Sequence, residues 1–193
     1  MIPVLLKVER VLIFGGGKVA KRKILGLKDC EVTIVSENFL KMPKGIKKIK
    51  AKIDEKNFKD YLGNFDLVIS ALNDKKLNER IAHECEKRKI PVNVVDSPEL
   101  CSIYFPAVIR EQFLTIAVST NGRCPFCSRI VKEKLKPYIE EIFPMIEILA
   151  EAREEVGGKI LKWVYKDSKF QNFIDSKNFK DARRRAREIM CLS

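Results

Sequence analysis

Blocks of apolar residues alternate with polar segments through the first hundred positions of the chain. Short continuous apolar runs bounded by turn residues are typical of strands buried on both faces of a parallel sheet. Four segments predict strands: the continuous apolar run at 11–14 and the largely apolar segments at 31–35, 66–71 and 92–95. Apolar residues at helical spacing occupy 19–27 and 77–85, and residues 46–53 alternate apolar side chains with lysine, which predicts an edge-like strand. This alternation predicts an α/β fold with a Rossmann-like, doubly wound parallel sheet.

The pattern changes in the second half of the chain. Residues 113–119 (FLTIAVS) predict one further strand, and residues 125–142 predict a helix that is interrupted at Pro137. From Met145 onward no strand signal remains. A chain of 193 residues is long enough for one α/β domain and a smaller appendage, so we expect a helical satellite at the C-terminal end.

Composition and charge narrow the class of protein. With 46% apolar and 33% charged residues, the chain has the balance of a soluble globular protein. Its net charge of +12 favours an anionic partner. Charge alone does not distinguish nucleic acid, acidic lipid and a small polyanion as that partner. The apolar residues 2–6 are followed by Lys7, Glu9 and Arg10, which argues against a signal peptide or a membrane span. We therefore expect a cytoplasmic protein with no membrane partner.

Cysteine and histidine usage limits the available chemistry. Six cysteines are scattered along the chain, which predicts reduced thiols rather than a disulfide framework. Cys124 and Cys127 form a CxxC motif, whose alternatives are a redox pair, half of a zinc site or two simple thiols at a helix start; the last is the default. His83, the single histidine, is interpreted as structural, so His-based hydrolase or metal chemistry is excluded and no resident metal is expected.

The segment GGGKVA at residues 15–20 matches the GxGxxA form of the dinucleotide fingerprint and stands between a predicted strand and a predicted helix. Gly15 suits the tight turn, Gly17 the close approach of pyrophosphate, and Ala20 the packing of helix against strand. Free N–H groups at the helix start, around Lys18 and Val19, favour the pyrophosphate charge. These residues predict a dinucleotide site.

The end of the second strand bears on the choice of dinucleotide. An NAD site usually carries an acidic residue there, which accepts hydrogen bonds from ribose hydroxyls. The strand runs into Ser36, Glu37 and Asn38, and either Glu37 or Asn38 suits that role. No arginine is adjacent to hold a 2′-phosphate, so NAD is preferred over NADP.

Four separated blocks carry a resemblance to a known family. They are IPVLLKVERVLIFGGGKVAKRK at 2–23, SALND at 70–74, NVVDSPELCSIYFPAVI at 93–109 and LTIAVSTNGRCP at 114–125. In their order and spacing they resemble the precorrin-2 dehydrogenase family, the dehydrogenase and ferrochelatase portion of siroheme synthase. The resemblance covers roughly residues 1–135.

The resemblance implies an activity and a layout. Members of the family oxidise precorrin-2 to sirohydrochlorin with NAD, and some also insert ferrous iron, so iron is at most a substrate. The implied layout is an NAD-binding Rossmann domain at 1–110, a dimerisation region at 111–145 and a helical C-terminal domain at 146–193, in a homodimer. Precorrin-2 bears eight carboxylate arms, so a basic protein suits it without any nucleic-acid partner.

The resemblance also implies site residues. Asp96, at the carboxyl end of the fourth buried run, is the candidate general acid/base, with capping of the turn into Ser97 as the structural alternative. The implied cofactor-binding residues also include Ser70, Ala71 and Asn93. The implied substrate-binding residues are Ser119, Thr120 and Gly122. The family usually has Ser before the Pro of this last loop, and here Cys124 takes that place.

A second hypothesis keeps the Rossmann fold without catalysis. In that case the chain would be an NAD-binding or nucleic-acid-binding module that uses its basic tail, KDARRRAR at 180–187. The tail has few aromatic residues to stack bases and is more typical of a solvated helix. Under the first hypothesis, Arg183, Arg184 and Arg185 would be candidates to hold tetrapyrrole carboxylates.

Overall fold

The computed structural model describes residues 6–27, 29–156 and 161–191. The chain divides into two compact units, Met1–Phe105 and Pro106–Ser193. Each unit has its own sheet and its own buried core. The predicted domain boundaries at 110 and 145 fall inside a strand and a helix of the second unit.

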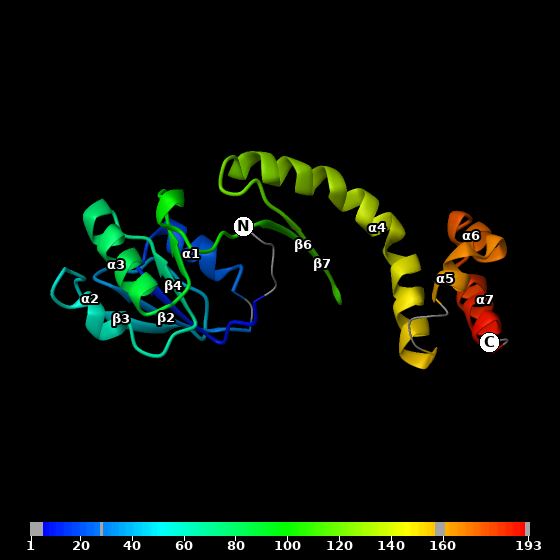
Figure 1. Cartoon of the computed structure of the whole chain (residues 1–193), viewed down its shortest axis with the longest axis horizontal. Coiled ribbons are helices and arrows are strands. Elements are labelled where there is room, and N and C mark those ends of the chain that lie inside the picture. The colour runs from blue at the N-terminus through cyan, green and yellow to red at the C-terminus, as the bar shows by residue number, and fades with distance from the viewer. Residues whose placement is uncertain (1–5, 28, 157–160, 192–193) are drawn as a thin grey trace. The chain divides into compact units, whose positions relative to one another are not determined.

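The first unit is built on one parallel sheet (Figure 1). Its strands are β1 (Arg10–Phe14), β2 (Glu31–Ser36), β3 (Lys47–Lys50), β4 (Leu67–Ser70) and β5 (Val92–Val94). They lie in the order β3-β2-β1-β4-β5, with β3 at an edge as predicted. The order reverses between β1 and β4, which is where doubly wound sheets open a crevice for ligands. The predicted fold class is confirmed.

Helices cover both faces of this sheet. They are α1 (Lys18–Ile24), α2 (Phe58–Tyr61), α3 (Lys75–Lys87) and the 3₁₀ turn η1 (Pro98–Leu100). In β1, Leu12 and Phe14 belong to the core that contains α3, whereas Val11 and Ile13 belong to the core that contains α1. Because successive side chains of a strand point to opposite faces, a strand buried on both faces must be continuously apolar. This is why the run at 11–14 was recognisable.

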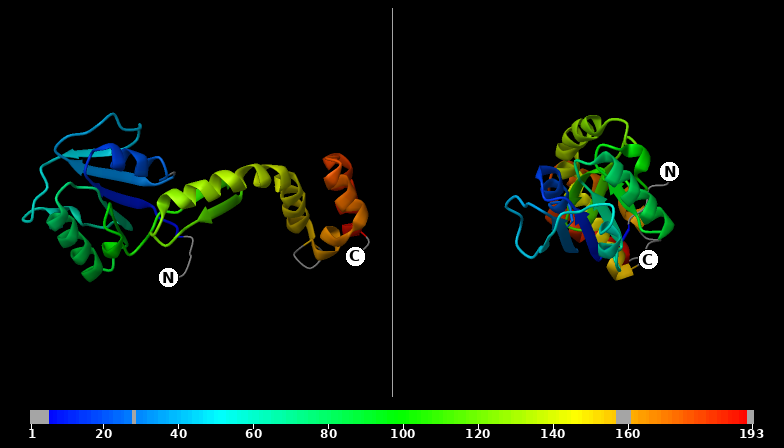
Figure 2. Two further views of the ribbon diagram at one scale, coloured as in Figure 1. Left: turned by 90° about the horizontal axis from the view of Figure 1, so that it is seen from above. Right: turned by 90° about the vertical axis from the view of Figure 1, so that its left-hand side faces the viewer.

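The second unit begins with an antiparallel hairpin of β6 (Ala107–Glu111) and β7 (Leu114–Val118) (Figure 2). The predicted strand at 113–119 is therefore confirmed, but it belongs to a separate two-stranded sheet. Its partner β6 was not predicted. The hairpin turn contains Gln112 at a φ of +36° and lacks the Gly or Asn-Gly pair that marks most tight hairpins in a sequence.

A single long helix, α4 (Pro125–Val156), follows the hairpin and packs on it. The predicted interruption at Pro137 is wrong, because α4 continues through both Pro137 and Pro144. A proline inside a helix removes one backbone hydrogen bond, and the helix can bend to accommodate the ring instead of ending. Figure 1 shows α4 bending along its length.

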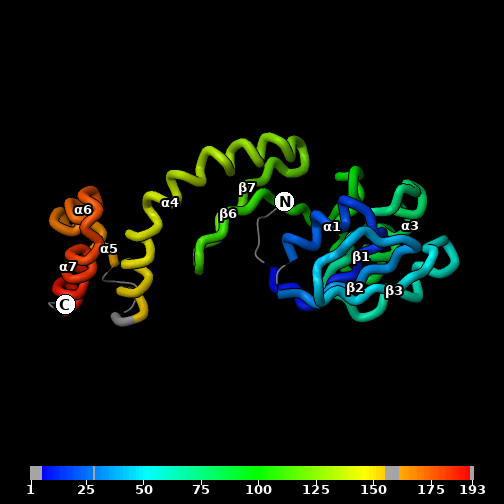
Figure 3. Tube along the Cα trace, turned by 180° about the vertical axis from the view of Figure 1, so that it is seen from behind, coloured from blue at the N-terminus to red at the C-terminus, as the bar shows by residue number. Residues whose placement is uncertain are grey.

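Three short helices follow α4; they pack on one another, and the first and third of them also pack against α4 (Figure 3). They are α5 (Leu161–Lys166), α6 (Ser168–Asp175) and α7 (Phe179–Cys191). Their core combines Ile148 of α4 with Val164, Phe170, Ala182 and Ala186. The expected helical satellite is confirmed.

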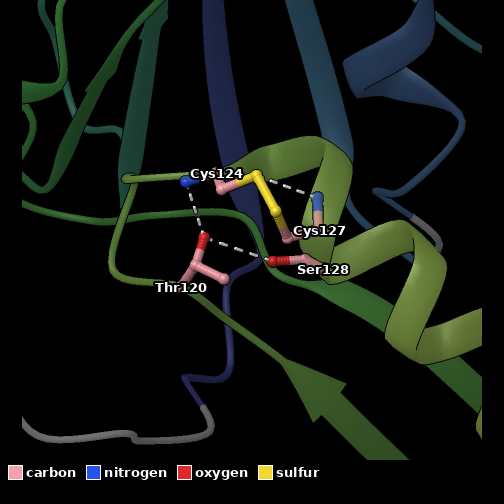
Figure 4. The surroundings of a disulfide bond; sticks show 4 residues. All are labelled: Thr120, Cys124, Cys127 and Ser128. Carbon is pink, nitrogen blue, oxygen red and sulfur yellow. Dashed lines mark hydrogen bonds between the residues drawn. A yellow bond between two sulfur atoms is a disulfide. The ribbon is translucent and has the colours of Figure 1, made fainter.

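One cysteine prediction is wrong. Cys124 and Cys127 form a disulfide at the start of α4, with their Cα atoms 5.2 Å apart (Figure 4). The prediction of reduced thiols rested on the scattered positions of all six cysteines. It overlooked that a separation of three residues on the first turn of a helix brings two sulfur atoms within bonding reach. Cys85 and Cys101 remain thiols.

Candidate active site

The glycine loop connects β1 to α1 and cannot accommodate side chains at its first two positions. Gly15 has a φ of +103°, and a Cβ there would lie 2.5 Å from the carbonyl oxygen of Ala71. A Cβ on Gly16 would lie 2.2 Å from the carbonyl oxygen of Asn38. Glycine is therefore required at both positions by the close approach of the loop to the segments after β2 and β4.

Gly17 differs, because a Cβ there would meet nothing within 4 Å. This residue is the N-cap of α1, and no side chain caps the helix. The first N–H groups of α1, around Lys18 and Val19, therefore have no side-chain acceptor. Lys18 is exposed beside them and adds positive charge. The arrangement fits the phosphate groups of a dinucleotide, whose oxygens would approach the backbone at Gly17.

A hollow of about 360 Å³ opens at the carboxyl ends of β1, β2 and β4. The residues that line it are Gly15, Gly16, Gly17, Ser36, Asn38, Phe39, Leu40, Ala71, Leu72 and Asn73. Three of them are large and apolar and suit a ring or ribose face, while the amide and hydroxyl groups and the loop backbone offer hydrogen bonds. The residues present fit NAD(P).

Five of the predicted cofactor residues line this hollow: Gly15, Gly17, Ser36, Asn38 and Ala71. The other five lining residues were not predicted. Gly16 could have been found from the run of three glycines, and Asn73 from the turn residues Asn73 and Asp74 that follow the run at 66–71. The residues Phe39, Leu40 and Leu72 carry no signal, because only the fold brings the segments after β2 and β4 together.

Two predicted cofactor residues, Ser70 and Asn93, are buried and donate hydrogen bonds within the protein. Ser70 Oγ donates a hydrogen bond of 2.7 Å to Asn78 Oδ1 on α3, and Asn78 Nδ2 donates to the carbonyl oxygen of Leu72. Asn93 Nδ2 donates to the carbonyl oxygen of Ile103 at 3.0 Å. Neither Ser70 nor Asn93 lines the hollow. The other polar atom of the Asn93 amide, Oδ1, is buried and has no hydrogen-bond partner among the described residues.

Glu37 is exposed immediately after β2, next to the lining residues Ser36 and Asn38. The Ser36 hydroxyl donates to the carbonyl oxygen of Asn38 at 2.8 Å and so shapes this turn. Of the two predicted ribose-binding candidates, Asn38 lines the hollow and Glu37 lies at its margin.

Asp96 is exposed just beyond β5, at the same carboxyl edge of the sheet as the glycine loop. Its φ of +61° is left-handed, a conformation that Asp and Asn tolerate better than most residues. The preceding residue, Val95, is fixed by a hydrogen bond from its N–H to the carbonyl oxygen of Ser70. Asp96 therefore presents an accessible carboxylate on an anchored segment.

The predicted substrate residues lie in the second unit, in the turn between β7 and α4. Thr120 Oγ1 accepts hydrogen bonds from the N–H of Cys124 at 2.9 Å and from the Ser128 hydroxyl at 3.4 Å. Ser119 Oγ accepts from the N–H of Asn121. Gly122 has a φ of +80°. The hydroxyl groups at 119 and 120 thus hold the turn that begins α4.

The three tail arginines, Arg183, Arg184 and Arg185, are paired with carboxylates of the second unit. Arg183 contacts Glu147 at 2.7 Å and Glu151 at 3.1 Å, and these partners raise the pKa of its guanidinium. The other pairs join Arg185 to Asp167 at 2.7 Å and Arg184 to Asp181 at 3.1 Å. Hydrogen bonds from Arg185 lower the pKa of the Asp167 carboxyl to about 2. Arg183 therefore joins α7 to α4, and Arg185 joins α7 to the start of α6, whereas Arg184 pairs within α7 and is exposed.

A larger hollow of about 730 Å³ lies at the opposite edge of the first unit. It is lined by the segments that precede β4 and β5, including Asp66 and Pro91. Ligands of doubly wound sheets bind at the carboxyl ends of the strands, so the smaller hollow is the better candidate site. Within the described residues, no group of three or more His, Cys, Asp or Glu side chains is arranged to hold a metal ion. The described helices include none with the length and apolar character needed to cross a membrane.

The strand order, the glycine loop and the hollow at the strand ends define a Rossmann-type dinucleotide-binding protein with an additional hairpin and helical unit. Comparison with known sequences agrees. The chain belongs to the family described as "Putative NAD(P)-binding", whose model matches residues 2–107.

Individual relatives extend the similarity beyond this unit. The chain is 33% identical over 161 residues to a siroheme synthase of Psychrobacter sp. (strain PRwf-1), covering 79% of this chain and 32% of that protein. It is 38% identical over 163 residues to a siroheme synthase of Blochmanniella pennsylvanica, covering 82% and 34%. The chain therefore spans about a third of the length of these relatives. A solved structure of SirC, a precorrin-2 dehydrogenase, matches with a TM-score of 0.64 at 21% identity, covering 100% of this chain and 98% of that one, which shows a shared fold.

Proposed function

We propose that the protein is a cytoplasmic, NAD-dependent dehydrogenase that oxidises precorrin-2 to sirohydrochlorin. The observation that carries the proposal is the nucleotide hollow with an accessible carboxylate at the same sheet edge, in a chain similar to siroheme synthases over most of its length. The net charge of +12 supports an anionic substrate such as a polycarboxylate tetrapyrrole.

The first unit supplies the cofactor site. NAD, when bound, accepts a hydride from the substrate. The backbone at Gly17 and the first N–H groups of α1 bind the phosphates, and Asn38 with Glu37 binds the ribose hydroxyls. The preference for NAD over NADP rests on the absence of an adjacent arginine and on the carboxylate of Glu37, which would repel a 2′-phosphate. Glu37→Ala should therefore lower the preference for NAD, measured as kcat/KM with NAD divided by kcat/KM with NADP.

Asp96 supplies the acid/base chemistry in this proposal. A carboxylate that is solvent-accessible and held on an anchored segment takes the proton that substrate carbon or nitrogen loses during oxidation. Asp96 is exposed, so a replacement that keeps its backbone conformation should leave the core undisturbed. The same carboxylate could accept pyrrole protons during ferrous iron insertion, and iron would then be a second substrate.

The second unit supplies a homodimer interface in this proposal. Helix α4 carries large apolar side chains that are at least a third exposed, at Phe126, Ile130, Val131, Leu135 and Tyr138. An isolated two-stranded hairpin also leaves strand edges that can pair with another chain. A second copy of the chain would cover both. The molar mass of the native protein by light scattering tests this: dimer mass is expected, and monomer mass at micromolar concentration would refute it.

Anaerobic turnover tests the activity. Precorrin-2 and NAD are mixed with the protein, and NADH is followed by its near-ultraviolet absorbance. The wild type is expected to form NADH, and Asp96→Asn is expected to lose about 100-fold or more in kcat. Asn preserves the left-handed backbone that Ala would strain, so the loss would report the carboxylate.

Asp60→Asn is the matched control. Asp60 is an exposed carboxylate on α2, before β4, and its removal should leave turnover unchanged. No NADH from wild-type protein that binds NAD would overturn the dehydrogenase. Normal turnover by Asp96→Asn would keep the dehydrogenase but remove Asp96 from its mechanism. Adding ferrous iron and measuring siroheme tests chelation separately.

A further inference from the structure

The CxxC pair at the start of α4 has no part in the proposed oxidation of precorrin-2. Cys124 is half-buried and Cys127 is exposed, and the two are joined by a disulfide (Figure 4). An exposed disulfide is open to attack by an external thiolate, whereas a buried structural one is shielded. Cys127 is the more exposed of the two residues, so we take it as the point of attack.

The surroundings favour negative charge on the other sulfur atom. Cys124 Sγ accepts a hydrogen bond of 3.2 Å from the N–H of Cys127, and it lies at the N-terminal end of a 32-residue helix. From residue 119 to residue 131 the only charged side chains are those of Arg123 and Arg129. A thiolate on Cys124 would be stabilised by the N–H donor, by the helix dipole and by these cations.

Opening the disulfide would leave the start of the helix intact. The N–H of Cys124 is bound to Thr120 Oγ1, and the N–H of Ser128 donates to the carbonyl oxygen of Cys124 at 3.2 Å. The Ser128 hydroxyl also reaches Thr120. These bonds hold the turn without the sulfur–sulfur bond, so the oxidised and reduced forms can share one backbone.

We propose that Cys124 and Cys127 form a thiol–disulfide exchange site whose substrate is a dithiol. One thiolate of the dithiol attacks Sγ of Cys127, the bond between the two cysteines breaks, and Cys124 leaves as the stabilised thiolate. The second thiolate of the dithiol then attacks the dithiol sulfur of the mixed disulfide and releases Cys127. The protein gains two electrons and two protons, and the dithiol becomes a cyclic disulfide. The pair is poorly suited to bind zinc, because among the described residues no third or fourth ligand group is arranged near the two cysteines.

The test equilibrates the full-length native protein in mixtures of reduced and oxidised dithiothreitol. Samples are quenched in acid, alkylated in denaturant and analysed by mass spectrometry of the peptide that contains both cysteines. The number of alkylated cysteines should rise by two as the mixture becomes reducing, and the curve should be the same from either direction. Circular dichroism should show the same helix content at both ends of the curve.

Two variants identify the roles of the sulfur atoms. Cys124→Ser lacks the resolving thiolate, so oxidised glutathione should leave a stable mixed disulfide on Cys127 in nearly all molecules. The wild type should carry at least tenfold less of this mixed disulfide. Cys191→Ser, which removes an exposed cysteine on α7, is the control and should leave the curve unchanged.

Either of two results would overturn the proposal. The first is a pair that is reduced only after the protein is unfolded in urea. The second is a reduced protein in which oxidised dithiothreitol does not join these two cysteines. The thiol count does not depend on precorrin-2 turnover, so the outcome is independent of the proposed dehydrogenase.

Discussion

The three glycines after β1 provide a sharp test of the site, because the structure gives each a different role. Replacing Gly16 by Ala would place a Cβ 2.2 Å from the carbonyl oxygen of Asn38, where ordinary contacts begin near 3.4 Å. The Asn38 segment would have to move by about 1 Å, and overpacking of this kind costs about 1–3 kcal/mol. The free energy of unfolding of Gly16→Ala should fall by that amount. Gly15→Ala should cost more, because its φ of +103° adds backbone strain.

Gly17→Ala should show the opposite pattern. Its backbone, with φ −85° and ψ −168°, is extended, and an added Cβ meets nothing within 4 Å. The small loss at an N-cap is offset by reduced freedom of the unfolded chain, so stability should change by no more than about 0.5 kcal/mol. The methyl group would instead occupy the place where pyrophosphate approaches the backbone. NAD affinity should fall at least tenfold, or about 1.4 kcal/mol.

Urea denaturation followed by circular dichroism gives the stability, and hydrogen exchange of the β1 and β4 amides assigns a loss to the first unit. Titration with NADH, followed by its fluorescence, gives the affinity. Gly63→Ala is the matched control, because Gly63 also has open space around it but lies at the opposite edge of the sheet. Unchanged stability in Gly16→Ala would refute the tight loop contact. Unchanged affinity in Gly17→Ala would refute the predicted path of the nucleotide.

Three further predictions concern single contacts. Asp167→Ala removes the cap of α6 and the partner of Arg185, so the helical cluster should lose about 1–3 kcal/mol at neutral pH by urea denaturation. Because the pKa of Asp167 is lowered from 3.8 to about 2, its contribution to the free energy of unfolding is present above about pH 4 and is lost as the pH falls towards 2. If Asp167→Ala lowered the free energy of unfolding as much at pH 2 as at neutral pH, this reasoning would be contradicted. Ser70→Ala leaves Asn78 without its buried donor and should cost about 1–3 kcal/mol of stability, with a change in NADH affinity of less than about twofold; a larger affinity loss would place Ser70 in the cofactor site. Leu135→Asp puts a charge on the exposed apolar face of α4 and should convert a dimer to monomers in light scattering, whereas an intact dimer would locate the interface elsewhere.

The sequence alone determined the class of fold and the position of the nucleotide loop. A strand buried on both faces is largely apolar, so the runs at 11–14 and 66–71 identified the sheet without knowledge of its neighbours. The glycine motif was equally local, because a turn at a positive φ and a close backbone approach exclude side chains. Both features are visible in a short stretch of sequence, although the segments that crowd Gly15 and Gly16, at Ala71 and Asn38, are supplied by the fold.

Only the tertiary structure decided which side chains meet. Phe39, Leu40 and Leu72 join the hollow because β2 and β4 both flank β1, a neighbourhood that no local pattern records. Ser70 and Asn93 are buried, and the Ser70 hydroxyl and the Asn93 amide nitrogen donate hydrogen bonds within the protein, whereas Asn93 Oδ1 has no partner among the described residues. Packing also decided that α4 continues through Pro137, because the sequence around a proline is the same whether the helix bends or ends there. It likewise decided that the tail arginines are paired, because a run of basic residues does not show which carboxylates lie opposite it.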